Sequence, residues 1–79
     1  MPVKAYVLVV TDPGQTKRVH SALKELPGIV ECHEVMGPYD IVAELVVESL
    51  TDVPPILSEK IRGIPGIEST TSLVSFPGS

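Results

Sequence analysis

Four runs of apolar and β-branched residues alternate with two stretches of helical spacing along this chain. The runs span residues 3–10, 29–36, 39–48 and 67–76, and their composition predicts β-strands. Apolar residues of the first intervening stretch recur at helical spacing, namely Val19, Ala22, Leu23 and Leu26. The second stretch predicts a helix that is capped by Ser49 or Thr51 and continues to Gly63. The predicted order is β-α-β-β-α-β.

The two halves of the chain repeat one unit. Leu26-Pro27-Gly28-Ile29 recurs as Ile64-Pro65-Gly66-Ile67, and in both copies the Pro-Gly pair ends a helix before Ile begins a strand. A helix–strand unit used twice in this way is typical of a split β-α-β arrangement. We therefore predict an α+β, ferredoxin-like fold, with a four-stranded antiparallel sheet in strand order 4-1-3-2 and both helices on one face.

Alternation along the first and third strands defines two sheet faces. The predicted core face, under the helices, is aliphatic: Val3, Ala5, Val7, Val9, Ile41, Ala43, Leu45 and Val47. The opposite face is mixed: Lys4, Tyr6, Leu8, Val10, Val42, Glu44, Val46 and Glu48. Because half of that second face is apolar, we expect another subunit to cover it, and the alternative is a monomer that tolerates it. The facing of strands 29–36 and 67–76 stays open, with a bulge expected near Glu34.

Composition narrows the class of protein. The 79 residues predict one domain over 1–79, with a net charge of −4. Lys17-Arg18 is the one adjacent basic pair, which argues against direct binding of nucleic acid. A single cysteine, Cys32, and no apolar run of about 18 residues predict a cytoplasmic protein without a membrane partner.

The sequence offers little catalytic chemistry. No Cys-x-x-Cys, His-x-x-x-His or three-ligand spacing is present, so no metal or other cofactor is expected. Adjacent Cys32 and His33 point to opposite faces of a strand, and His20 on the first helix is expected to be solvated. Nucleophile and phosphate-loop motifs are lacking as well, so an enzyme is disfavoured.

One polar constellation remains, at the Gly37-Pro38-Tyr39-Asp40 turn and on the last strand. Asp40 could accept the ammonium group of an amino acid, while the hydroxyls of Thr70 and Ser72, two residues apart and so on one face, could donate to its carboxylate. With strands 2 and 4 at opposite edges, we expect these groups to meet only across a subunit contact. The alternative is that Asp40 merely caps the turn.

These residues resemble the C-terminal effector domain, called RAM, of the Lrp/AsnC family. The matching segments are Leu26 to Cys32, Val35-Met36-Gly37-Pro38-Tyr39-Asp40-Ile41 and Ile64 to Ser72. The resemblance implies dimers formed by sheet packing, their assembly into a tetramer, octamer or decamer, and an amino acid bound where dimers meet. It places Gly37, Tyr39 and Asp40 in the ligand loop, Thr70 and Ser72 at its hydroxyl positions, and Val35 and Val74 among its apolar lining.

The chain departs from the family pattern at its start. Full-length members carry a helix-turn-helix, whereas Met1 here directly precedes the first strand. We therefore expect a stand-alone, amino-acid-binding effector module without direct DNA binding, possible partners being further copies or a full-length family regulator. Two alternatives are a small dimeric α/β-barrel enzyme, of monooxygenase or isomerase type, that uses the cleft between helices and sheet, and a purely structural assembly subunit.

Overall fold

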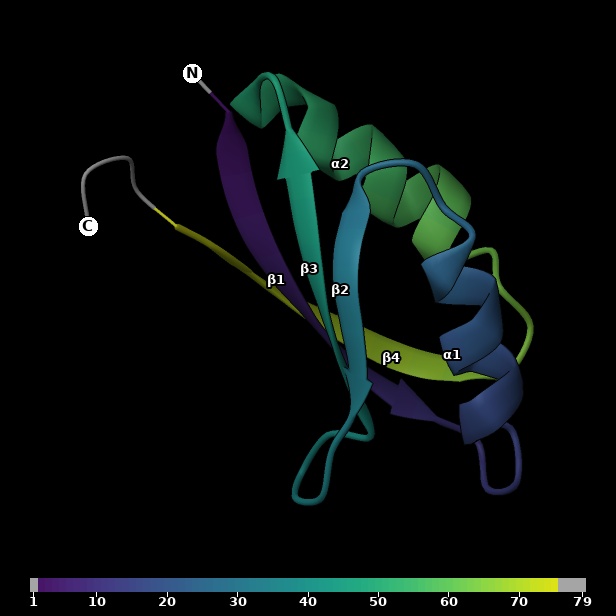
Figure 1. Ribbon diagram of the computed structural model, residues 1–79. Coiled ribbons are helices and arrows are strands. Elements are labelled where there is room, and N and C mark those ends of the chain that lie inside the picture. Colours follow the sequence, from purple (N-terminus) through teal and green to yellow (C-terminus); the bar gives the residue numbers. More distant parts are fainter. Residues whose placement is uncertain (1, 76–79) are drawn as a thin grey trace.

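The computed structural model describes residues 2–75 and shows the predicted arrangement of elements (Figure 1). The strands are β1 (Val3–Thr11), β2 (Ile29–Glu34), β3 (Ile41–Val47) and β4 (Ile67–Val74). The first helix is α1 (Thr16–Lys24). The second helical segment consists of a 3-10 turn (Leu50–Asp52), α2 (Val53–Pro55) and a π-helical part (Ile56–Ile61). Residue 76 of the last predicted strand lies outside the described residues.

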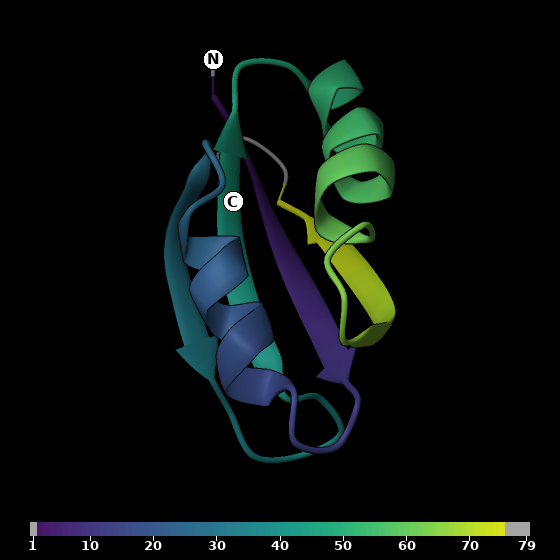
Figure 2. The same ribbon diagram turned by 90° about the vertical axis from the view of Figure 1, so that its right-hand side faces the viewer.

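The four strands form one antiparallel sheet in the order β2-β3-β1-β4, which confirms the predicted topology. Both helices lie on the same side of this sheet (Figures 1 and 2), as the ferredoxin-like fold requires. The two central strands, β1 and β3, therefore carry one face that the helices cover and one open face.

No helix of the described residues is long and apolar enough to cross a bilayer.

The covered face holds the core. Its buried strand residues are Ala5, Val7, Val9, Ile41, Ala43, Leu45 and Val47, which confirms the odd-numbered alternation. Val19 and Leu23 of α1, with Val53 and Ile61 of the second helical segment, close over them. Full burial of each such Val, Leu or Ile side chain contributes roughly 1.5–3 kcal/mol, so this aliphatic layer is the main source of stability.

The register settles the facing of the outer strands. Tyr6 lies opposite Leu73, and Leu8 lies opposite Thr71, so these β4 residues belong to the open face. On β2, Glu31 and His33 pair with Glu44 and Val42 and share the open face too. The register shift in β2 falls between Ile29 and Glu31, so the expectation of a bulge near Glu34 is wrong.

The connection between β2 and β3 is longer than the predicted turn. β2 ends at Glu34 and β3 begins at Ile41, and the loop 35–40 is closed by a 2.9 Å hydrogen bond from the Val35 N–H to the Asp40 carbonyl. Gly37 has a φ of +138°, which L side chains rarely adopt, and Pro38 has no N–H to donate. The paired ladder therefore cannot continue through residues 36–39.

Ser49 caps the second helical segment, as one of the two predicted caps. Its side chain accepts from the Thr51 N–H, while the Asp52 carboxylate accepts from the Ser49 N–H at 3.2 Å. This reciprocal capping box fixes the segment at the end of the sheet that is opposite the loop 35–40 (Figure 1).

Candidate functional site

Asp40 ties three parts of the fold together at one end of the sheet. Its N–H donates to the Val9 carbonyl at 2.8 Å, and its own carbonyl accepts from Val35. Its carboxylate oxygen Oδ2 accepts from the Thr11 N–H at 2.9 Å. Since the backbone pairing of β1 with β3 ends at Val9 and Ile41, the side chain supplies an acceptor just beyond the last rung. The Asp40 carboxylate therefore caps the end of the β1–β3 ladder by bonding to β1.

That role uses only one of the two carboxylate oxygens. Within residues 2–75, no hydrogen bond involves Oδ1 of Asp40. No buried side-chain nitrogen or oxygen atom of these residues lacks a partner, so Oδ1 of this half-buried side chain is in contact with solvent. A carboxylate can accept several hydrogen bonds, and those from a charged donor are the stronger ones. Structural use of Oδ2 thus leaves Oδ1 open to an ammonium group.

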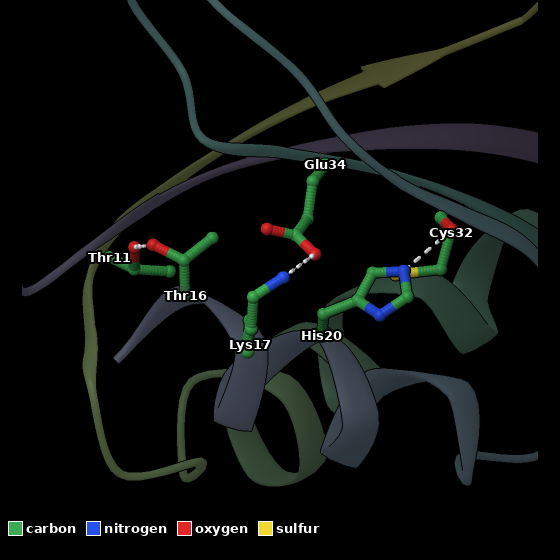
Figure 3. A network of polar contacts seen from close by, with 6 residues as sticks. All are labelled: Thr11, Thr16, Lys17, His20, Cys32 and Glu34. Carbon is green, nitrogen blue, oxygen red and sulfur yellow. Dashed lines mark hydrogen bonds and ion pairs between the residues drawn. The ribbon is translucent and has the colours of Figure 1, made fainter. Parts of the chain in front are cut away.

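Thr11 is the buried polar residue beneath Asp40, with 5% of its surface exposed. Its Oγ1 lies 2.7 Å from Oγ1 of Thr16, the first residue of α1, and donates to Oδ2 of Asp40 over a longer 3.4 Å (Figure 3 shows the threonine pair). Thr11 was not among the predicted site residues. A usable signal was present, because Thr11 is the polar end of an otherwise aliphatic series of core-facing positions on β1, and a buried hydroxyl needs a partner.

The β4 residues of the constellation lie on the covered face of the sheet. Thr70 is opposite Val9, Ser72 is opposite Val7, and Val74 is opposite Ala5. The expectation that Thr70 and Ser72 share one face is correct.

Asp40 and these hydroxyls are separated by less than the full width of the sheet. Asp40 directly precedes the interior strand β3, and Ile41, Val9 and Thr70 form one row across the sheet. Only β1 therefore lies between, which is a separation of about 10 Å at two strand spacings. Ser72 and Val74 follow about 7 and 14 Å farther along β4, at a rise of about 3.4 Å per residue. The structure thus brings Thr70 nearest to Asp40 and leaves Val74 distant.

The other candidate residues belong to the loop itself. Val35 is 39% exposed, Tyr39 is half-buried, and nothing lies within 4 Å of where a Cβ of Gly37 would stand. The loop also presents Met36, which is 97% exposed and was not among the predicted site residues. The loop that ends at Asp40 therefore presents an apolar, accessible surface.

Two contacts hold α1 against β2 next to this loop. Nε2 of His20 lies 2.9 Å from the Cys32 carbonyl oxygen, and Lys17 pairs with Glu34 at 3.6 Å (Figure 3). His20 is half-buried, so the expectation that it is solvated is wrong. Burial raises the pKa of the Cys32 thiol, which disfavours the reactive thiolate. These residues therefore hold α1 against β2 and supply no reactive group to the candidate site.

A cavity of about 420 Å³ lies elsewhere, at the opposite end of the sheet. It is lined by Pro27, Gly28, Val47, Glu48, Asp52, Pro55, Ile56, Glu59 and Lys60, none of which belongs to the predicted site. Val47 ends β3 while Asp40 precedes its start, so roughly 20 Å of strand separates the two places. Asp40 and the loop 35–40 therefore lie on an open surface outside this cavity.

The interior gives the enzyme alternative no support. Of the buried residues in the described part of the chain, Thr11 is the polar one and the others are aliphatic, while Thr70 and Ser72 on the covered face are half-buried. No group of three or more His, Cys, Asp or Glu in that part of the chain could hold a metal ion.

Comparison with known proteins decides the family. Residues 4–77 match the model of the Lrp/AsnC ligand binding domain. The chain belongs to the Lrp/AsnC family. It is 37% identical over 75 residues to an uncharacterized HTH-type transcriptional regulator of Pyrococcus furiosus, covering 91% of this chain but 50% of that regulator. The chain thus spans about half the length of the curated relatives that it matches.

Solved structures share the fold of this chain. A crystal structure of a protein from Thermus thermophilus superposes with a TM-score of 0.92 at 27% identity, covering 98% of this chain and 96% of that one. A transcriptional regulator of Neisseria meningitidis, solved as a complex with L-Met, superposes with a TM-score of 0.83 at 12% identity, over 96% of this chain and 51% of that one. The second likeness concerns the fold alone. The chain is therefore a ligand-binding domain of a family of transcriptional regulators.

Proposed function

We propose that this chain is an amino-acid-binding effector module that works as an oligomer and modulates the regulation of amino-acid metabolism in the cytoplasm, without binding DNA itself. The observation that carries the proposal is that the two carboxylate oxygens of Asp40 differ in their contacts, since Oδ2 is bound to Thr11 and Oδ1 is open to solvent. The family assignment and the L-Met complex of the Neisseria regulator support it. The net charge of −4 and the dispersed basic residues favour a module without DNA contacts of its own.

The proposed ligand contacts follow from the loop and from β4. The ammonium group of the amino acid binds Oδ1 of Asp40, and its carboxylate accepts from backbone N–H groups around Gly37 and from the Thr70 hydroxyl. Val35 and Tyr39 contact the side chain of the ligand. Ser72 and Val74 lie too far along β4 to reach the same molecule, so in this proposal they line the pocket of an adjoining copy.

The open sheet face supports the oligomeric part of the proposal. Tyr6, Leu8, Val10, Val42 and Val46 are only half-covered within one chain, and Leu73 beside them is 54% exposed. This many half-exposed apolar side chains on one face of a small domain are typical of a subunit contact. Residues 1–79 act in this proposal as one domain whose copies assemble through that face. A full-length family regulator is the second partner that the same surface could accept.

A pair of Asp40 variants tests the proposal. Asp40→Asn keeps an oxygen for the Thr11 N–H but replaces the other oxygen by an amide that cannot accept from an ammonium group. Asp40→Ala removes both oxygens and leaves the Thr11 N–H without its partner, at a cost of about 1–3 kcal/mol of folding stability. We expect both variants to lose amino-acid binding, while only Asp40→Ala loses stability.

The measurement is isothermal titration of the wild type and both variants with each of the twenty free L-amino acids, alongside urea unfolding. Heat with at least one amino acid, abolished in Asp40→Asn at unchanged stability and oligomer size, supports the proposal. Absence of heat with all twenty on correctly assembled wild type contradicts it, as does full binding by Asp40→Asn.

A further inference from the structure

Two hydroxyl groups, of Thr16 and Thr11, form a hydrogen-bonded series that ends at the carboxylate of Asp40. Thr16, at the start of α1, lies 2.7 Å from Thr11, and Thr11 donates to Oδ2 of Asp40 at 3.4 Å. A carboxylate only accepts, so both contacts are made at once when Thr16 donates to Thr11 and Thr11 donates to Asp40. In that arrangement the order of donation is Thr16 to Thr11 to Asp40.

The position of Thr11 in the fold directs both of its donors to Asp40. Thr11 is 95% covered, whereas Asp40 is half-buried and Oδ1 contacts solvent. Thr11 lies beyond the last β1–β3 pair, Val9 with Ile41, so its N–H takes the side chain of Asp40 as its acceptor. Two donors of one residue, the N–H and the hydroxyl, therefore converge on one oxygen of Asp40.

We propose that Thr11 and Thr16 are positioning residues for the amino-acid site. They hold Oδ2 of Asp40 inward, which turns Oδ1 outward to the loop surface where the ammonium group of an amino acid arrives. Buried hydrogen-bond partners that fix a rotamer in this way set the geometry of a binding group without touching the ligand. This inference rests on the proposed function, and it extends the site into β1 and the first turn of α1.

The chemistry predicts which substitutions keep the function. Serine at position 11 retains the hydroxyl that both donates to Asp40 and accepts from Thr16. Valine is close to threonine in shape but lacks the hydroxyl, and so leaves Thr16 without its acceptor and Oδ2 with the N–H alone. Alanine at position 16 removes only the far end of the chain, at a half-buried helix start that tolerates it.

The test uses the whole protein with Thr11→Val, Thr11→Ser and Thr16→Ala, and Ser21→Ala as the control on the exposed face of α1. The first readout needs no ligand: amide hydrogen exchange at residue 11, referenced to the Val46 N–H, which binds the Gly28 carbonyl at 2.8 Å at the other end of the sheet. We expect exchange at residue 11 to accelerate about tenfold in Thr11→Val, the size of one lost hydrogen bond to a charged group, and less in Thr16→Ala. Val46 is expected to be unchanged throughout.

The second readout is titration with the twenty free L-amino acids. Any amino acid that binds the wild type is expected to bind Thr11→Val about tenfold more weakly, while Thr11→Ser and Ser21→Ala stay within about twofold. Wild-type exchange at residue 11 in both Thr11→Val and Thr16→Ala would overturn the positioning role, whatever the titration gives. Faster exchange with unchanged affinity would overturn its link to binding.

Failure of the proposed function is a separate result. A wild type that binds no amino acid contradicts the proposed function. Hydrogen exchange at residue 11 still tests, in that case, whether Thr11 and Thr16 position the Asp40 carboxylate. Should Thr11→Val not fold, Thr16→Ala decides between the same two outcomes, since it leaves the buried position untouched.

Discussion

The two faces of the sheet come from the same central strands and are built for different neighbours. On the covered face, every residue of β3 from Ile41 to Val47 that points to the helices is aliphatic and buried. On the open face, Lys4 and Glu44 form an ion pair amid half-exposed Leu8, Val42 and Val46. The aliphatic core of the covered face specifies the fold, whereas apolar residues with a charged pair among them are typical of a contact between folded subunits.

The largest expected difference is in unfolding free energy, between alanine variants of a leucine on the covered side and of a leucine on the open side. Leu23→Ala empties a fully buried position and is expected to cost about 2–5 kcal/mol of unfolding free energy, which is most of the stability of so small a domain. Leu73→Ala, at a site 54% exposed, should cost the single chain no more than about 0.5 kcal/mol. Urea unfolding measures both, and equal losses at low protein concentration would contradict the division of roles between the faces.

The covered face was predictable from the sequence because two signals agreed there. Alternation fixed the facing of β1 and β3, and the repeated Leu-Pro-Gly-Ile and Ile-Pro-Gly-Ile segments fixed where each helix yields to a strand. No comparable signal existed for β2, because the bulge between Ile29 and Glu31 shifts the alternation by one residue.

The candidate site was only partly predictable. The Gly37-Pro38-Tyr39-Asp40 segment is visible in the sequence, but the end of β2 depends on the φ of Gly37 and on the closing bond from Val35 to Asp40. Placing Asp40 at an edge of the sheet ignored that it starts an interior strand, which made Thr70 seem remote. The use of Oδ2 by Thr11 arises because the β1–β3 pairing ends at Val9 and Ile41, an end point that no pattern of apolar residues encodes.

An intermediate effect is expected from a charge on the open face. Leu8 lies between Val42 and Thr71, near the centre of that face. Leu8→Glu adds a carboxylate to a surface that already carries Glu44, and should dissociate the oligomer while the single chain keeps its fold. Sedimentation velocity gives the mass, and circular dichroism gives the fold. Ser21→Glu adds the same charge on the outside of α1 and should leave the assembly intact. An unchanged mass for Leu8→Glu, or a monomeric wild type at high concentration, would refute the proposed interface.

The smallest effect concerns the Lys4–Glu44 pair, whose charged atoms lie 3.1 Å apart. The hydrogen bond and the charge of Glu44 raise the pKa of the Lys4 ammonium above its ordinary value of 10.5. A raised pKa in the folded state means that the pair stabilises the fold fully below pH 10.5 and that this contribution disappears as pH rises through the higher, folded-state value. The contribution is small in a single chain because Lys4 is exposed to water.

Unfolding of the wild type and Glu44→Gln should therefore differ slightly below pH 10.5 and converge above the raised value. Protein concentration turns this weak pair into a probe of the open face. If another subunit covers that face, the pair is shielded from water in the assembly, and loss of one partner leaves an uncompensated buried charge on Lys4. The cost of Glu44→Gln should then grow with protein concentration. A difference that stays equally small from dilute to concentrated protein would mean that water, and not a second sheet, lies against this ion pair.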